Sequence, residues 1–78
     1  MEKKKLEVLI LKEGGKFTAV TSEKDKNNEL TAFVGPVLEH ITEHIARLAT
    51  SGPYSELDIR TTTSYKDFFA FVNKHIAA

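Results

Sequence analysis

The stretch GPVLEHITEHIARLAT (residues 35–50) decides the architecture, because it is the longest segment of the chain with a regular apolar spacing. Its apolar residues recur every three or four positions, which places side chains on one face of an α-helix. They are Val37, Leu38, Ile41, Ile45 and Leu48. Pro36 suits the first turn of a helix, where its missing N–H is no loss, and Gly52-Pro53 is typical of a helix end. The sequence therefore predicts a helix from Pro36 to about Thr50, with Gly52 in the left-handed conformation after it.

Upstream of this helix, two β-rich runs flank a glycine turn. Residues 6–11 (LEVLIL) and 16–21 (KFTAVT) lie on either side of Gly14-Gly15, and such a pair of glycines is typical of a tight hairpin. One face of this hairpin would carry Leu6, Val8, Ile10, Phe17 and Ala19, and the other Leu9, Leu11, Thr18 and Val20. A first strand that is apolar on both faces is typical of the centre of a sheet, or of a sheet whose outer face is covered.

Residues 29–34 (ELTAFV) fit two structures. Their apolar residues continue the helical spacing, with Asn28 placed to cap a longer helix. Gly35-Pro36 argues for a break, because proline inside a helix costs about 3 kcal/mol or more. With a break, residues 29–34 form either a short helical turn or a strand, and the sequence does not choose between them. Residues 22–28 are predicted to be a polar loop.

The C-terminal third predicts one more strand and one more helix. Residues 54–60 (YSELDIR) alternate, with Leu57 and Ile59 on one side and charged residues on the other, which is typical of a strand with one solvated face. Ser64-x-x-Asp67 resembles a capping box and predicts a helix start. That helix would run to about Ile76. Its apolar stripe comprises Tyr65, Phe68, Phe69, Val72 and Ile76.

These elements predict an α+β fold with the order β-β-α-β-α, in one domain that spans residues 1–78. The doubly apolar first strand belongs between the other two. We therefore expect a three-stranded, mostly antiparallel sheet with the strand order 2-1-3 and both helices on one face, which makes a two-layer sandwich.

Composition narrows the function classes. The chain has 78 residues, no cysteine, and 11 basic against 11 acidic residues, so disulfides and thiolate metal sites are excluded. A net charge of zero argues against dominant attraction to nucleic acid or an anionic membrane. No apolar run approaches the roughly 20 residues that cross a bilayer, and residues 6–11 are fewer than the roughly 7–15 of a signal-peptide core. We expect a cytoplasmic protein that needs no cofactor.

One string resembles an enzyme motif. His40-x-x-Glu43-His44 is the pattern of the inverted zinc peptidases, in which two imidazoles one helical turn apart hold zinc and the glutamate activates water. A third protein ligand is also needed, and here it would be a distant carboxylate or His75. The helical periodicity already places this string on the solvated flank of the helix. We interpret it as structural, with a metal-dependent hydrolase at His40 and His44 as a remote alternative.

Two polar features have similar competing interpretations. The hydroxyls of residues 61–64 lie at a predicted helix start, where free N–H groups can hold an anion, but Ser64 and Asp67 already serve as caps. Lys12 and Lys16 on the hairpin could contact a nucleic-acid backbone. Single-strand binders also need stacking aromatics, and Phe17 is the only one nearby. Lysines that discourage edge-to-edge aggregation explain the pattern more simply.

An apolar surface without a partner is the remaining feature. Phe71 lies about 120° from the predicted stripe of the last helix at 100° per residue, with His75 one turn further on and Phe68 at the border. Leu9, Leu11 and Val20 occupy the sheet face that the predicted fold leaves uncovered. Exposed aromatic clusters often mark interfaces. We therefore expect a small non-enzymatic interaction domain, acting as an adaptor, inhibitor or regulator, that binds itself as a homodimer or docks to another protein. A nucleic-acid accessory protein that uses Lys12 and Lys16 is the alternative.

Overall fold

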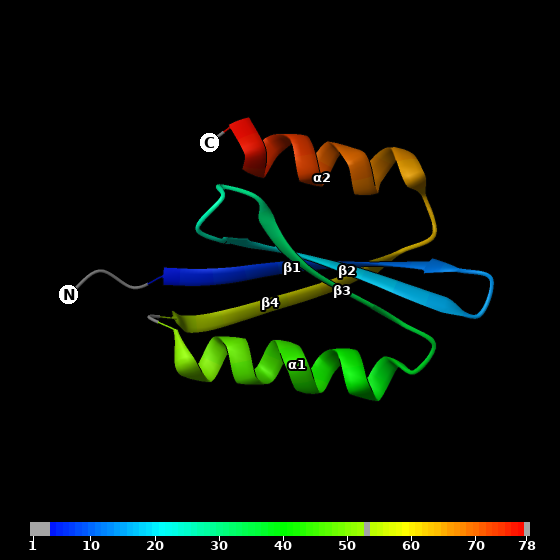
Figure 1. Ribbon diagram of the computed structural model, residues 1–78. Helices are drawn as coiled ribbons and strands as arrows, with labels where there is room; N and C mark the ends of the chain where they lie inside the picture. The colour runs from blue at the N-terminus through cyan, green and yellow to red at the C-terminus, as the bar shows by residue number, and fades with distance from the viewer. Residues whose placement is uncertain (1–3, 53, 78) are drawn as a thin grey trace.

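The computed structural model describes residues 4–52 and 54–77 and contains four strands and two helices in that part of the chain. In chain order they are β1 (Lys4–Glu13), β2 (Lys16–Lys24), β3 (Leu30–Gly35), α1 (Leu38–Ser51), β4 (Tyr54–Thr62) and α2 (Tyr65–Ala77). The strands form one sheet in the order β3-β2-β1-β4. Figure 1 shows that the helices cover opposite faces of this sheet. The fold is thus α+β with three layers.

The hairpin is confirmed, and its turn has the predicted chemistry. Gly14 and Gly15 both have positive φ angles, of 47° and 80°, which glycine adopts without strain. Glu13 pairs with Lys16 across the turn, and Ile10 pairs with Ala19. This register places Leu6, Val8 and Ile10 on one face of β1.

The ambiguous segment forms a strand, β3, over Leu30–Gly35, and a polar turn makes it possible. Asn28 takes a φ of 64°, and the Asp25 side chain accepts hydrogen bonds from the backbone N–H groups of Asn27 and Glu29 at 2.8 and 3.1 Å. Buried Thr21 donates a hydrogen bond to the carbonyl of Thr31 at 2.9 Å. The chain therefore reverses after β2 and returns as β3, antiparallel to it.

This extra strand overturns the predicted sheet. A right-handed helical crossover joins parallel strands, and α1 leaves from β3 rather than from β2. Since β3 runs antiparallel to β2, the strand after the crossover runs antiparallel to β2 and parallel to β1. The predicted three-stranded, mostly antiparallel sheet is therefore wrong, and the sheet has four strands with a mixed direction.

The prediction of both helices on one face is also wrong. A helix that follows β4 can return over either face. The face of β1 opposite α1 carries Leu9 and Leu11, which are buried. Covering that apolar face with α2 removes it from water, and hydrophobic burial favours that arrangement.

The main core lies between α1 and the sheet. Leu6, Val8 and Ile10 of β1 pack with Ile41 and Ile45 of α1, as the periodicity predicts. The helix begins at Leu38, two residues later than predicted. It ends at Ser51, and the N–H of the following Gly52 donates to the Leu48 carbonyl at 3.1 Å. Gly52 has an extended φ of −101°, so the predicted left-handed cap is wrong; Pro53 lies outside the described residues.

Candidate interaction surfaces

The six residues predicted to form an interface come together between α2 and the sheet. Leu9, Leu11 and Val20 are buried on the sheet side. Phe68, Phe71 and His75 are partly buried on the helix side, and the rings of Phe71 and His75 lie 4.4 Å apart. The fold thus pairs the two apolar surfaces with one another within the chain. Their apolar character is explained by this internal layer.

A polar pair also lies within this layer. The Nε2 atom of His75 is 3.4 Å from an Oε2 atom of Glu7 on β1. That distance is within the range of an ion pair, but the geometry is not that of a hydrogen bond, and the buried Nε2 atom has no hydrogen-bond partner among the residues that the structure describes. Glu7 lies on the same face of β1 as Leu9. The His75–Glu7 pair is therefore located between α2 and the sheet.

The stripe predicted for the core of the last helix is largely exposed. Tyr65, Phe69 and Ile76 have 51, 57 and 55% of their surface accessible. At 100° per residue they lie on one flank of the helix, about 90° from the direction of Phe68 and His75. The prediction was wrong because the helix carries two apolar stripes, and the one with Phe71 and His75 faces the sheet.

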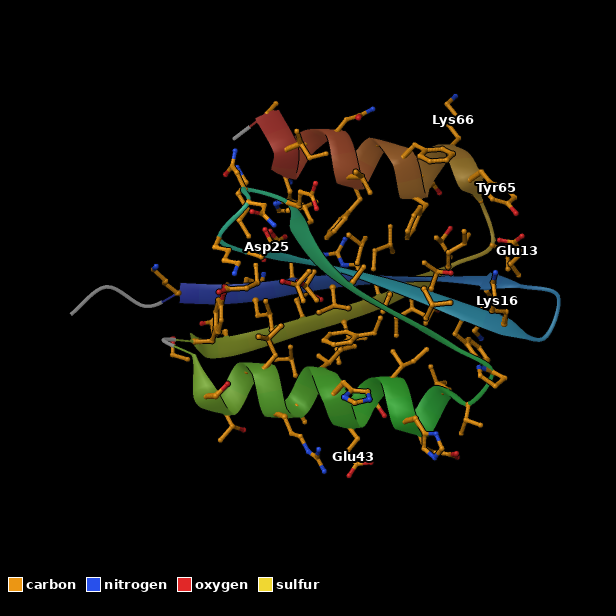
Figure 2. All side chains as sticks on the ribbon, in the orientation of Figure 1. Glu13, Lys16, Asp25, Glu43, Tyr65 and Lys66 are labelled. Carbon is orange, nitrogen blue, oxygen red and sulfur yellow. The ribbon has the colours of Figure 1, made fainter. Side chains whose placement is uncertain are left out.

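The start of α2 is held by its own polar groups. The Ser64 hydroxyl accepts a hydrogen bond from the Asp67 N–H at 3.3 Å, which confirms the predicted cap. The Ser64 N–H donates to the Thr62 hydroxyl at 3.0 Å. Glu13 also accepts a hydrogen bond from the phenol of Tyr65, and this bond is the main cause of a raised Tyr65 pKa. Figure 2 shows both side chains at the same end of the molecule. The hydroxyls of residues 62 and 64 therefore serve the helix start.

Strand β4 forms one open edge of the sheet, and its apolar residues are incompletely covered. Leu57 and Ile59 lie opposite Leu6 and Val8 of β1, so they face the α1 layer as predicted. They are nevertheless 43% and 37% exposed, because no strand lies beyond β4 among the described residues. A shallow hollow of about 240 Å³ beside them is lined by Leu57, Tyr54 and Ala49 of α1, among others.

The other face of β4 is charged. Asp58 lies 3.4 Å from a guanidinium nitrogen of Arg60 on the same strand and 3.7 Å from Lys5 of β1. Arg60 is the more exposed partner, with 75% of its side chain accessible. Exposed ion pairs of this kind contribute little to stability. These charges nevertheless have a defined order along the open edge of β4, with the acidic Asp58 two residues before the basic Arg60.

The opposite edge, β3, differs in its protection. It has six residues against nine in β4, and Gly35-Pro36 ends it. Short strands and flanking prolines are common means of blocking edge pairing. Val34 of β3 is 62% exposed and lies on the α2 face of the sheet, since it pairs with Thr18 and through it with Leu11.

The histidines of the zinc-like string are placed on the β3 flank of α1. The ring of His44 stacks on Phe33 with centroids 5.3 Å apart and 8° between the ring planes. Glu43 pairs with Arg47 at 3.1 Å, and Figure 2 shows Glu43 on the side of α1 away from the sheet. Within the described residues, no three histidine, aspartate or glutamate side chains gather in a way that could hold a metal ion.

The hairpin lysines are exposed at the end of the sheet. Lys12 and Lys16 flank the turn together with Glu13, which adds an acidic group between them. Phe17 packs against the core beneath α1. Tyr65 of α2, which is 51% exposed, lies at the same end of the molecule, where its phenol bonds to Glu13. One aromatic side chain therefore stands near the basic groups, and it is engaged by the acidic group between them.

Comparisons with known proteins give no further guide: no family model, curated protein or solved structure matches the chain. Among the described residues, no helix is both long and apolar enough to cross a membrane. Sequence reasoning placed residues 54–60 at an edge of the predicted sheet but did not single out Leu57 and Ile59 as exposed, which they are at 43% and 37%. The signal available was that edge position, because a side chain on an edge strand has a neighbouring strand on one side only.

Proposed function

We propose that this protein is a small non-enzymatic interaction domain that binds a second copy of itself and acts in the cytoplasm as an adaptor, inhibitor or regulator. The observation that supports self-association is the open edge of β4. Nine residues long and without proline or glycine, this strand leaves Leu57 and Ile59 partly exposed. Charges on its other face and a register shift at its pairing with Lys4 and Lys5 are among the devices that limit pairing at such an edge, but Leu57 and Ile59 leave its α1 side apolar and uncovered.

The flank of α1 above β4 extends the same surface. His44 stacks on Phe33 of β3, so the opposite flank of α1 faces β4. That flank carries Thr42, Ala46 and Ala49, which are small and uncharged. Leu57 and Ile59 therefore lie beside small side chains that let a second polypeptide approach closely, and the Glu43–Arg47 pair borders Ala46 on the outer side of the helix.

The exposed apolar area is modest, and this sets the expected affinity. Interfaces smaller than about 1,200 Å² are usually those of weak, transient complexes. We therefore expect a dissociation constant of about 1 μM or weaker. The protein should exchange between one and two copies over an experimentally accessible concentration range.

Sedimentation equilibrium from about 1 μM to 1 mM tests the proposal. The average mass should rise toward twice that of the 8.7 kDa chain. Ile59→Lys should keep the protein monomeric, because it places a charge on the apolar side of the edge. Val34→Lys, at an even more exposed position on the other edge strand, is the matched control and should dimerise like the wild type. A monomeric wild type across the whole range would overturn the proposal.

A further inference from the structure

We infer that β4 pairs antiparallel with β4 of the second copy about a two-fold axis at Ile59, so that Asp58 of each copy faces Arg60 of the other. This inference rests on the proposed self-association and specifies its register. It is carried by three properties of β4: the direction of its free backbone groups, the order of its charges and the apolar side chains beside them.

The free backbone groups of β4 can be identified from β1. The N–H of Glu7 donates to the Ser22 hydroxyl on β2 at 3.1 Å, so the backbone of Glu7 faces β2. Successive residues of a strand present their backbone groups to opposite sides, and Val8 therefore faces β4. The hairpin turn gives the same result. Glu13 and Lys16 flank the two-residue turn and direct their backbone groups toward each other, so the odd-numbered residues of β1 face β2 and the even-numbered ones face β4.

In a parallel pair, a residue bonds to the two neighbours of the residue opposite it. Val8 lies opposite Ile59 and so bonds with Asp58 and Arg60. The N–H and C=O groups of Ile59 then point away from the sheet, and by alternation so do those of Leu57 and Thr61. These residues can form a ladder with an added strand.

The charges select one symmetric register. When a strand pairs with its own copy, residues at equal distances from the axis lie opposite one another. An axis at Ile59 brings Asp58 opposite Arg60 twice. An axis at Asp58 would place Glu56 opposite Arg60 twice but would oppose two aspartates at its centre, and an axis at Arg60 would oppose two arginines. An axis at Leu57 would oppose Glu56 and Asp58. Like charges directly opposite are destabilising, so the register centred on Ile59 is favoured.

The same register places these charges at the closest positions. Asp58 and Arg60 direct their backbone groups toward β1, so in the new pair they occupy non-hydrogen-bonded sites. Opposite residues at such sites have Cα atoms only about 4.5 Å apart. Arg60, whose side chain is 75% exposed, pairs with Asp58 of its own chain, whose side chain is 24% exposed. Exchanging this contact for the partner's Asp58 replaces one ion pair by another of the same kind.

The apolar side chains on the α1 side of β4 are also covered in this register. Ile59 faces Ile59 of the partner, and Leu57 faces the partner's Thr61, on the side that bears α1. A two-fold axis perpendicular to the sheet keeps both α1 helices on that side. Their small residues Ala46 and Ala49 face the seam. The two sheets of four strands would then become one continuous sheet.

A charge exchange tests the register. Asp58→Arg gives a chain in which arginines oppose one another, and Arg60→Asp gives one in which aspartates do. Each variant alone should dimerise at least about tenfold more weakly than the wild type. An equimolar mixture should form a heterodimer, because every facing pair is then opposite in charge. The double variant Asp58→Arg/Arg60→Asp should dimerise like the wild type.

Covalent capture provides a second, independent test. The chain has no cysteine, so Ile59→Cys introduces a single thiol at the proposed axis. Facing residues in a hydrogen-bonded pair have Cα atoms about 5.5 Å apart, which is within the range that a disulfide spans. Mild oxidation should give a covalent dimer much faster than it does for Val34→Cys. Circular dichroism should show that each variant remains folded.

The outcomes separate the two proposals. A monomeric wild type removes both. A wild type that dimerises, while its single charge variants dimerise equally well and Ile59→Cys crosslinks no faster than Val34→Cys, overturns this register and leaves self-association in place. Loss of dimer in both charge variants without recovery in their mixture also overturns the register, because the facing of Asp58 and Arg60 requires that recovery.

Discussion

The two faces of the sheet are covered by helices of similar length but very different burial. In the α1 layer, Ile41 and Ile45 are 2% and 0% exposed and pack with Leu6, Val8 and Ile10. In the α2 layer, no residue of the helix is fully buried. The sheet beneath α2 contributes Leu9 and Leu11 but also Glu7. The α1 layer is therefore a closed apolar core, and the α2 layer is a partly open one.

The difference shows how each helix is held in place. The residue preceding α1, Val37, makes no side-chain cap, so its position depends on buried side chains. The start of α2 has the Ser64 cap and the hydrogen bond from Tyr65 to Glu13. Apolar burial contributes about 25 cal/mol per Å², so most of the stability should come from the α1 layer. Polar contacts at its ends orient α2.

The largest expected effect is therefore in the α1 layer. Ile45→Ala removes a fully buried side chain and should lower the free energy of unfolding by about 2–5 kcal/mol. Ile76→Ala on α2 is the matched control, because its side chain is 55% exposed, and it should change stability by less than about 0.5 kcal/mol. Urea denaturation followed by circular dichroism measures both. Equal losses for the two variants would contradict the proposed division between the layers.

Ile45→Ala could leave too little folded protein for a reliable measurement, since a chain of this length is expected to have only about 4–12 kcal/mol of stability. Ile45→Val is then the gentler form of the same test. It should cost about 0.5–1.5 kcal/mol, still more than Ile76→Ala. The ranking of the two positions decides the comparison.

The sequence predicted the α1 layer well for a physical reason. Ile41 and Ile45 belong to a regular helical spacing, and Gly14-Gly15 fixes the register that places Val8 and Ile10 together. Both signals are local. A single continuous apolar stripe can be buried in only one orientation of the helix on the sheet. Local spacing alone therefore specifies the residues of this layer, whatever the order of the strands.

The direction of β4 and the α2 layer could not be predicted in the same way. Whether residues 29–34 form a strand depends on their pairing with β2, which is a long-range contact. That single element makes β4 run parallel to β1, whereas its place at the edge of the sheet follows from the predicted order as well. The sequence also does not show which side of α2 faces the sheet. Two sets of residues form equally regular stripes on this helix: Tyr65, Phe69 and Ile76, and Phe68, Phe71 and His75. Local spacing cannot rank two stripes of one helix.

A smaller effect is expected from the polar pair in the α2 layer. His75→Leu removes a buried nitrogen that has no hydrogen-bond partner within residues 4–52 and 54–77 and keeps an apolar contact with Phe71. Removing an unsatisfied buried polar group should raise the free energy of unfolding by about 1 kcal/mol. Glu7→Gln, which keeps the shape and removes the charge, is the control and should change stability little. Marked destabilisation by both variants would show that the ion pair holds α2 on the sheet.

The smallest effect concerns the start of α2, where the Tyr65 pKa is raised, mainly because its phenol donates a hydrogen bond to Glu13. Glu13→Ala should therefore lower the Tyr65 pKa toward its ordinary value of about 10. Since the folded state raises this pKa, the contact stabilises the protein below the ordinary value and is lost as the pH rises through the raised one. Ultraviolet titration of the tyrosines measures the shift, and Tyr54, the other tyrosine of the chain, should titrate alike in both proteins. An unchanged Tyr65 titration would mean that the cap at Ser64, and not Glu13, positions the first turn of α2.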